Sequence, residues 1–397
     1  MSSHASHKYA LAFREPITVV GGNMGEVDGN KNRKPIAVDL FSGAGGLSQG
    51  LKMAGFDIRL AVESEIDPCV TYMENNPGIP VICKPIQDIP NFKFFVKRIA
   101  HDGEKIDLVA GGPPCQGFSH ANTRNRGEEN DHSQLVWNFY RAVKQMEPRA
   151  FLMENVPGIK STKDRRVVSD LLSDFDSLGY EVSEMQVLAS EYGVPQNRRR
   201  FFLVGSKGGR IDPPKPTHGD EGRHPFVTVG DAIMGDLPRL DNNNGVKYGE
   251  YSSEPTSEYQ RWLRKGSPGL SDHMTTKTGS LVNERFQRIK PGGNLNKLMA
   301  SGELPEWLKI RIDHGGVYHR LELDKPSYTI VNFRKAMIIH PIENRLLTLR
   351  EAARLQSFRD VVRFRGQISF MQQMIGDSVP PLLAKALSKP ICNQLLE

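Results

Sequence analysis

Cysteine is scarce in this sequence. The only four are Cys69, Cys83, Cys115 and Cys392. They lie far apart and include neither a CxxC pair nor a Cys/His cluster at metal-ligand spacing. This pattern argues against a disulfide framework and against a structural zinc. We therefore expect four reduced thiols and no bound metal.

Long apolar runs are also missing. No stretch approaches the roughly 20 apolar residues that a membrane span requires. The polar start MSSHASHKYA lacks the apolar core of a secretory signal. The sequence therefore predicts a cytoplasmic protein that is neither secreted nor inserted into a membrane.

The length and the charge set broader limits. A chain of 397 residues exceeds the usual size of one domain, which predicts one large domain and one smaller domain. The 52 Lys and Arg residues against 46 Asp and Glu residues give a net charge of +6. This balance permits a polyanionic partner but does not identify one.

The first 210 residues contain two kinds of sequence. Residues 1–32 combine glycines with scattered charges and show no sustained period, which predicts a flexible N-terminal arm. Over residues 33–210, short apolar runs alternate with helix-like stretches. The runs are Ile36–Leu40, Ile58–Val62, Ile106–Ala110, Ala150–Met153 and Phe201–Val204. Continuous apolar strands separated by helices are typical of a parallel sheet covered on both faces, so we expect a doubly wound α/β domain.

The remaining chain divides near residue 340. Residues 211–340 are rich in proline, glycine and polar turns, which predicts a separate, small, loop-rich domain. Helical periodicity returns in Leu346–Phe358 and around Pro381–Leu387. We therefore expect residues 341–397 to rejoin the first domain.

A glycine-rich stretch, AVDLFSGAGG, follows the first expected strand and precedes a helix that begins near Leu47. Gly43, Gly45 and Gly46 allow a tight turn close to a ligand, and the helix N-terminus offers unpaired N–H groups. The spacing departs from the GxGxxG fingerprint of dinucleotide-binding proteins. This turn alone leaves a cofactor site and a simple tight turn as alternatives.

Two acidic residues follow at the ends of the next expected units. Glu63 could accept hydrogen bonds from ribose hydroxyls, although by itself it better fits a solvated charge at a strand end. Asp88 could accept a bond from the amino group of an adenine. The glycine-rich turn, Glu63 and Asp88 thus lie on consecutive strand–helix turns. Together they favour a cofactor that contains adenosine, bound at the carboxyl edge of the sheet.

Three further stretches contain groups suited to catalysis. The run DLVAGGPPCQGFS places Cys115 after a strand and a rigid proline turn, where its thiol can project into a cleft. The run FLMENVP ends a strand in Glu154, a position where a buried strand rarely carries an unused charge. The run VPQNRRRFF sets Gln196, Arg198 and Arg200 at alternate positions, hence on one side of an extended segment.

In this order, the stretches resemble the blocks of the DNA cytosine-5 methyltransferase family, of the bacterial and archaeal restriction-modification type. DLFSGAGGLS resembles its cofactor block, GGPPCQGFS its nucleophile block, MENV its acid block and QNRRRFF its QxRxR block. RLLTLREAARLQSF is similar to the block that holds the small domain, and IGDSVPPLLA to the last block. The resemblance covers about residues 34–387. Two positions depart from the pattern: Asp377 replaces the usual Asn, and Arg359 stands where Pro is frequent.

The resemblance implies a Rossmann-like, S-adenosylmethionine-dependent methyltransferase fold with a target-recognition domain at residues 211–340. It also implies a thiolate at Cys115 that adds to carbon 6 of a cytosine. Glu154 would hold ring nitrogen 3 and the amino group, and Gln196, Arg198 and Arg200 would bind the carbonyl oxygen and a phosphate. S-adenosylmethionine would be the cofactor, with no metal. The residues implied to bind it are Asp39, Phe41, Gly43, Gly45, Gly46, Glu63, Asp88, Pro113 and Asp377.

The implied partner is double-stranded DNA, from which the target cytosine is flipped. We expect a monomer that associates with the nucleoid and protects DNA from a companion restriction enzyme. A loop over residues 119–130 is expected to close over the DNA.

The sequence bears on three alternative functions. A transfer-RNA-directed branch of the same family carries similar blocks, but the long insert and the missing Cys-Phe-Thr signature favour DNA. A catalytically silent DNA-binding homologue has no chemical reason to keep Cys115, Glu154 and the QxRxR block together. A Rossmann oxidoreductase leaves Cys115 unexplained and does not fit the glycine spacing.

Overall fold

The structure is a computed structural model that describes residues 33–100, 104–114, 131–160, 165–240, 245–310 and 317–397. Within it, Lys34–Glu397 forms one compact unit. The predicted flexible arm at residues 1–32, Cys115 and the predicted closing loop at residues 119–130 lie outside the described residues.

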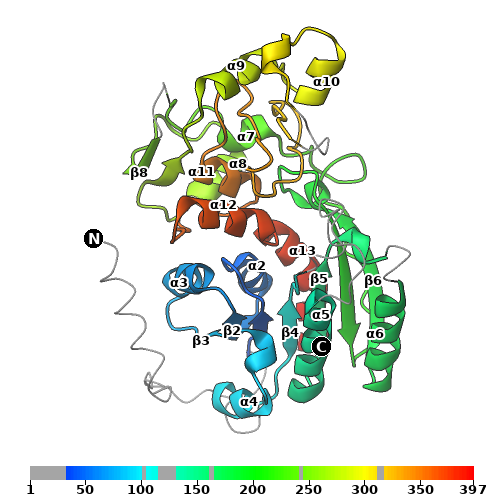
Figure 1. The fold of residues 1–397 in the computed structure, drawn as a ribbon. Helices are drawn as coiled ribbons and strands as arrows, with labels where there is room; N and C mark the ends of the chain where they lie inside the picture. The colour runs from blue at the N-terminus through cyan, green and yellow to red at the C-terminus, as the bar shows by residue number, and fades with distance from the viewer. Residues whose placement is uncertain (1–32, 101–103, 115–130, 161–164, 241–244, 311–316) are drawn as a thin grey trace. The chain divides into compact units, whose positions relative to one another are not determined.

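The compact unit contains a seven-stranded sheet (Figure 1), with the strand order β3-β2-β1-β4-β5-β7-β6. Its strands are β1 (Ile36–Leu40), β2 (Asp57–Glu63), β3 (Val81–Cys83), β4 (Leu108–Gly111), β5 (Ala150–Asn155), β6 (Glu181–Leu188) and β7 (Arg199–Ser206). Strands β1 to β5 pair in parallel, and β7 runs antiparallel to both β5 and β6. The predicted mostly parallel, doubly wound sheet is confirmed.

The strands that were predicted from the sequence are those whose residues are mostly buried on both faces of the sheet. Every residue of β1, β4 and β5 is buried, because helices cover both faces of the sheet there. The two strands that sequence analysis missed, β3 and β6, are the edge strands of the sheet. Strand β3 is only three residues long, and β6 alternates exposed with buried residues. Neither forms the continuous apolar run that identified the others.

Two layers of helices sandwich the sheet. One layer packs α2 and α13 against the sheet through Leu47, Leu51, Leu383 and Leu387, and the other packs α5 and α6 through residues such as Phe139. The helices around the sheet are α2 (Gly46–Ala54), α3 (Ile66–Asn75), α4 (Lys93–Ile99), α5 (Asp131–Met146), α6 (Arg165–Ser177) and α13 (Pro381–Leu396). The chain therefore encloses the sheet between segments from its beginning, its middle and its end.

Helices α2 and α13 lie side by side although they are more than 300 residues apart in sequence (Figure 1). A Cβ atom on Gly46 would lie 2.3 Å from the carbonyl oxygen of Val379, and one on Gly50 would lie 2.3 Å from Cβ of Ala384. Both positions therefore require glycine. This contact brings the last sequence block back against the first.

A second region, which contains the elements from α7 to α12, consists of short elements joined by long loops. Its elements are α7 (Val229–Ile233), β8 (Gly245–Gly249), α8 (Glu258–Arg264), β9 (Leu270–Met274), α9 (Ser280–Arg288), α10 (Leu295–Ala300), α11 (Leu349–Leu355) and α12 (Ile368–Asp377). Strands β8 and β9 pair in a two-stranded antiparallel sheet. Helix α11 packs against α7 and β9, so only the final part of the C-terminal segment, α13, packs on the first sheet. The smaller, loop-rich region expected from the sequence is present.

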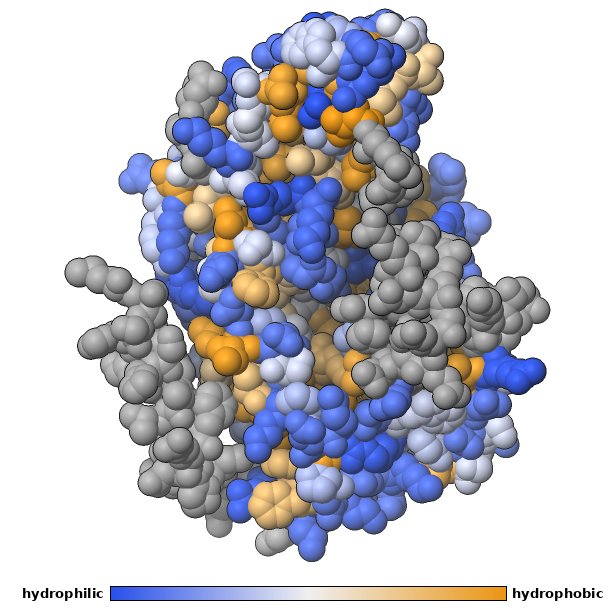
Figure 2. Space-filling view, viewed as in Figure 1, coloured by the Kyte–Doolittle hydropathy of each residue, from blue (hydrophilic) through white to orange (hydrophobic). Residues whose placement is uncertain are grey.

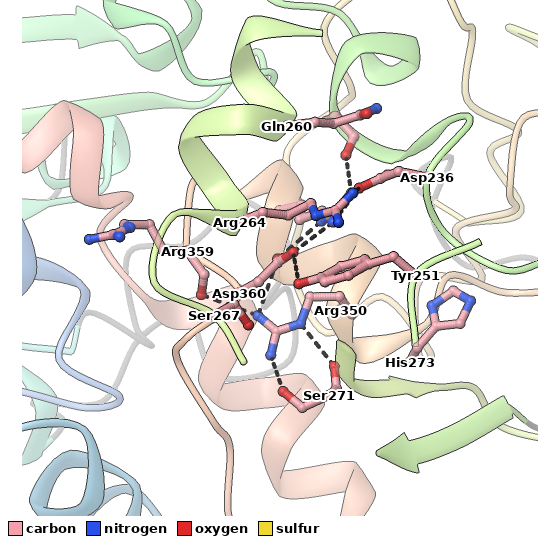
Figure 3. A network of polar contacts seen from close by, with 12 residues as sticks. Asp236, Tyr251, Gln260, Arg264, Ser267, Ser271, His273, Arg350, Arg359 and Asp360 are labelled. Atoms are coloured by element: carbon pink, nitrogen blue, oxygen red, sulfur yellow. Dashed lines mark hydrogen bonds and ion pairs between the residues drawn. The ribbon is translucent and has the colours of Figure 1, made fainter. Parts of the chain in front are cut away.

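A buried network of charged side chains joins the loops of this second region (Figure 3). Arg354 donates from Nη1 and Nη2 to the two carboxylate oxygens of Asp236, at 2.7 and 2.9 Å, and from Nη2 to Asp360 at 2.6 Å. Arg350 donates from Nε to the carbonyl of Ser271 at 2.9 Å. The side chains of both arginines and of Asp236 and Asp360 are fully buried.

The cysteines correct one expectation. Cys69 in α3 and Cys83 at the end of β3 form a disulfide, with their Cα atoms 6.1 Å apart. The sequence predicted four separate reduced thiols, but α3 and β3 both pack beside the end of β2, which brings these two sulfurs together. Cys392 is a free, buried thiol.

The surface is mixed in character. Figure 2 shows hydrophilic residues over most of the visible face, with apolar residues in separate patches. Among the described residues, no helix is long and apolar enough to span a membrane.

Candidate active site

The site lies where parallel strands end. Glu63 ends β2 and Gly111 ends β4, while Glu154 lies one residue before the end of β5. Since β1, β2, β4 and β5 run in parallel, their carboxyl ends meet at one edge of the sheet. Ligands of open α/β sheets bind at this edge.

The glycine-rich turn after β1 has an unusual backbone. Gly43 and Gly45 have positive φ angles of 53° and 85°, and Phe41 also has a positive φ, of 57°. Such a conformation is rare for a bulky side chain and occurs mainly where a functional geometry is imposed. A Cβ atom built on Gly43 would meet nothing within 4 Å, so this backbone faces open space. Gly45 caps the N-terminus of α2, whose first residue is Gly46.

Glu63 is held rigidly at the end of β2. Its Oε2 accepts a bond from the backbone N–H of Gly43 at 2.8 Å. Its Oε1 accepts bonds from the N–H groups of Ser64 and Glu65, at 2.8 and 3.0 Å. The carboxylate therefore ties the loop after β2 to the glycine-rich turn after β1.

A buried polar network lies behind this turn. Asp39 is fully buried, and its Oδ2 accepts a 2.6 Å bond from the hydroxyl of Ser48, which is also 2.6 Å from the hydroxyl of Tyr72. Burial raises the pKa of the Asp39 carboxyl to about 7. Oδ1 of Asp39 and the hydroxyl of Ser42 are buried and have no hydrogen-bond partner among the described residues. Sequence analysis missed Ser48 and Tyr72; the position of Ser48 within DLFSGAGGLS was the available signal.

Asp88 lies at the next turn of the same edge. It ends a short 3₁₀ helix, Ile86–Asp88, and its side chain is exposed. Arg141 of α5 donates to the carbonyls of Ile86 and Ile89, at 2.8 and 2.6 Å. These bonds fix the turn and leave the Asp88 carboxylate facing outward.

The proline turn after β4 contacts the end of β5. The carbonyl oxygen of Pro113, a buried residue, accepts a bond from the side-chain amide of Asn155 at 3.4 Å. A Cβ atom on Gly112 would lie 3.1 Å from Oε2 of Glu154. Cys115 lies outside the described residues, two positions beyond Pro113.

Glu154 is paired with Arg200. The guanidinium Nε of Arg200 lies 2.8 Å from Oε1 of Glu154, and both side chains are 12% exposed. Their strands, β5 and β7, are antiparallel neighbours. Burial lowers the pKa of Arg200, while the Glu154 carboxylate favours the charged guanidinium. The pair can therefore present a carboxylate and a cation side by side.

The other two residues of the QxRxR block face the interior. Gln196 is fully buried, donates to the carbonyl of Leu355 at 3.1 Å and accepts from the N–H of Ile330 at 2.8 Å. Arg198 is 1% exposed and donates from Nη1 to the carbonyls of Ile330 and Gly376, both at 2.9 Å. Sequence reasoning expected all three polar side chains of the block to contact the substrate. Only Arg200 borders Glu154, since the described bonds of the other two are internal.

Asp377 ends α12, next to the Gly376 carbonyl that Arg198 binds. Both of its carboxylate oxygens accept bonds from Gln373 at 2.8 Å. Gln373 in turn accepts a 2.9 Å bond from Asn332. The residue that departs from the family pattern therefore takes part in a chain linking α12 to the segment around Asn332.

Among the described residues, no group of three or more His, Cys, Asp or Glu side chains is arranged to hold a metal ion. The described part of the site contains acids, one arginine and a glycine-rich turn that faces open space at Gly43.

The mostly parallel sheet and a glycine-rich turn at its carboxyl edge define a Rossmann-like methyltransferase fold. The chain matches the model of the C-5 cytosine-specific DNA methylase family over residues 36–393. The chain belongs to this family and is a DNA (cytosine-5)-methyltransferase.

Comparison with individual proteins supports the same family. The chain is 34% identical to the Type II methyltransferase M.DdeI of Desulfomicrobium norvegicum over 377 residues, which cover 89% of this chain and 88% of the relative. It is 32% identical to the Type II methyltransferase M.AgeI of Thalassovita gelatinovora, covering 89% and 98%. A crystal structure of a prophage-encoded DNA modification methyltransferase from E. coli superimposes with a TM-score of 0.71 and 28% identity, covering 91% of this chain and all of the other.

Proposed function

We propose that this enzyme transfers a methyl group from S-adenosylmethionine to carbon 5 of a cytosine flipped out of duplex DNA, through a covalent bond between Cys115 and carbon 6. The observation that carries the proposal is the buried pairing of Glu154 with Arg200, beside the turn that leads to Cys115. The family match supports the reaction class.

The residues at the carboxyl edge fit the proposed cofactor. Gly43 faces open space, and Asp39 and Ser42 carry buried polar atoms that have no partner among the described residues. Glu63 and Asp88 would hold the ribose and the adenine amino group, and their negative charge suits a cationic ligand. Phe41, Gly45, Gly46, Pro113 and Asp377 would complete the site. When bound, S-adenosylmethionine supplies an electrophilic methyl group.

Glu154 and Arg200 would prepare the target base. Glu154 would hold ring nitrogen 3 and the amino group, and a proton held at nitrogen 3 makes carbon 6 more electrophilic. Arg200 would bind the carbonyl oxygen and stabilise the charge that develops when the Cys115 thiolate adds to carbon 6. Addition at carbon 6 turns carbon 5 into a nucleophile and divides a difficult step into easier ones.

Gln196 and Arg198 are proposed to position these groups. Their bonds tie the start of β7 to Ile330, Leu355 and Gly376. They would therefore fix the place of Arg200 relative to the second region.

Residues 211–340, the target-recognition domain expected from the sequence, are proposed to read the base edges of the DNA. Base flipping costs a few kcal/mol of stacking and pairing energy, which contacts in the pocket would offset. The names of the relatives support a role beside a companion restriction enzyme. A monomeric state and a cytoplasmic, nucleoid-associated location stay predictions.

Incubating the full chain with methyl-labelled donor and random-sequence DNA, followed by mapping of the modified cytosines, tests this proposal. We expect label at carbon 5 within one short sequence, and no label with Cys115→Ser. A transfer RNA substrate in parallel tests the main alternative. Label on RNA alone, or no label on either nucleic acid, would contradict the proposal.

A further inference from the structure

The sulfur atoms of Cys69 and Cys83 lie beside the proposed cofactor edge. Cys83 ends β3 and is the register partner of Glu63 on β2. Cys69 stands in the first turns of α3, which begins directly after the loop at Ser64 and Glu65. The disulfide therefore joins the two segments that flank Glu63.

Each sulfur also faces a carbonyl of that loop. Cys69 Sγ lies 3.6 Å from the carbonyl oxygen of Glu63, and Cys83 Sγ lies 3.9 Å from that of Glu65. A thiol can donate a weak hydrogen bond to such an oxygen, whereas a disulfide sulfur has no proton to donate. The two redox states of the pair therefore hold the loop differently.

The same loop fixes the Glu63 carboxylate. The N–H groups of Ser64 and Glu65 bind one of its oxygens, and the N–H of Gly43 binds the other. A shift of the loop changes how Glu63 is presented to a ligand. The sulfur pair is thus connected to the proposed ribose site through a short series of contacts.

We propose that Cys69 and Cys83 form a reversible dithiol–disulfide site that reacts with low-molecular-weight disulfides such as glutathione disulfide, and that the dithiol form binds the cofactor more tightly. The second part of this inference rests on the proposed function, which places the cofactor at this edge.

The two cysteines have suitable accessibility. Cys83 is half-buried, whereas Cys69 is 1% exposed. The Cys83 thiolate attacks one sulfur of glutathione disulfide, forms a mixed disulfide and releases one glutathione thiolate. The Cys69 thiolate then attacks the Cys83 sulfur, forms the internal disulfide and releases the second glutathione. Two protein thiols are oxidised, and one glutathione disulfide is reduced to two thiols.

The test uses the full chain with Cys115→Ser, which removes the thiol proposed as the nucleophile. Protein equilibrated in glutathione buffers of increasing disulfide fraction is alkylated, and the modified cysteines are mapped by mass spectrometry, with buried Cys392 as the internal control. We expect Cys69 and Cys83 to lose their alkylation together, and added dithiothreitol to restore it. Absence of an internal disulfide under oxidising buffer would overturn the proposal.

Calorimetric binding of S-adenosylhomocysteine is then measured in both redox states. We expect weaker binding by the disulfide form, by about five-fold or more, the lower end of ordinary coupling between sites. By reciprocity, the ligand should raise the dithiol to disulfide ratio by the same factor. The double variant Cys115→Ser, Cys83→Ser should bind equally under both conditions, since it cannot form the internal bond.

Equal affinity of the two redox states would overturn the inference and leave the proposed function intact. If the reduced protein binds no S-adenosylhomocysteine, the proposed function and the inference both fail. A redox effect that persists in the double variant would assign it to a residue other than Cys83 and would also contradict the inference.

Discussion

The sheet and the second region are held together by different forces. The sheet is buried between helices that contribute apolar residues, and β1, β4 and β5 contain no exposed residue. The second region also contains apolar clusters, but its loops are joined by buried arginines. One region depends chiefly on the hydrophobic effect and the other depends in addition on paired polar groups.

Arg320 shows how paired polar groups stabilise the second region. It is 3% exposed and donates to the backbone carbonyls of Phe286, Ile289 and His340, at distances of 2.6, 2.6 and 2.9 Å. Loops without regular structure leave carbonyl groups unpaired, and a buried guanidinium can satisfy several of them at once. A loop-rich region can therefore be ordered without long helices or strands.

The substitution with the largest expected effect tests whether the methyl-transfer reaction depends on residues at the edge of the sheet. Glu154→Gln keeps the size of the side chain and removes its charge, so turnover should fall by roughly 10²- to 10⁴-fold. DNA binding should be largely kept, because the second region is untouched. Single-turnover methylation and a DNA-binding titration check this, and full activity would remove Glu154 from the mechanism.

Arg354→Met tests the second region. The change removes the closest cation from the buried carboxylates of Asp236 and Asp360, which should cost about 3–5 kcal/mol. Arg264 and Arg350 lie farther away, each 3.7 Å from one of these carboxylates. Hydrogen exchange should show the loss of protection in the second region before the sheet. The matched control is Arg288→Met, whose 3.1 Å pair with Glu284 is exposed and should contribute less than about 1 kcal/mol. Equal effects of the two substitutions would contradict the importance of the buried network.

The pH dependence of stability tests Asp39 in the sheet region. Burial raises its pKa to about 7 in the folded protein, above the ordinary carboxyl value of 3.8. Between these values the folded state binds more protons than the unfolded state, so this carboxyl lowers stability as the pH rises from about 4 to 7. The effect should be a few kcal/mol. Urea unfolding across this pH range should show that the free energy of unfolding depends less on pH in Asp39→Asn than in the unmodified protein. An unchanged pH dependence would contradict a buried Asp39 carboxyl with a raised pKa.

The smallest effect concerns the contact between α2 and α13. Gly50→Ala places a Cβ atom 2.3 Å from Cβ of Ala384 and should cost about 1–3 kcal/mol through overpacking. Gly279→Ala is the control, because a Cβ atom there meets nothing within 4 Å and Gly279 has a negative φ of −74°. Thermal unfolding of both variants measures the difference. If Gly50→Ala proves no more destabilising than the control, the close contact between these helices is not required.

The contrast between the buried sheet and the loop-rich second region also explains which features could be predicted from the sequence. Continuous apolar runs identified five of the strands, and β1 was predicted at its observed bounds. The blocks around Glu63 and Glu154 marked the edge of the sheet because acids ended apolar runs. Edge strand β6 was missed because it alternates exposed and buried residues.

Other features depend on contacts that no local pattern records. Arg354 meets Asp236 across 118 positions of sequence, and Arg198 meets Gly376 across 178. The pairing of Cys69 with Cys83 likewise follows from how α3 and β3 pack beside β2. Alternate spacing suggested that Gln196, Arg198 and Arg200 share a face, but it could not show that two of them are used inside the protein.

The most direct test of the central claim is covalent trapping. DNA with 5-fluorocytosine at the mapped target is incubated with the full chain and S-adenosylmethionine, and the products are separated under denaturing conditions. The account predicts a stable protein–DNA adduct that maps to Cys115 and is absent with Cys115→Ser. Failure to form the adduct, with DNA that is methylated normally when it carries cytosine, would contradict the proposed covalent mechanism.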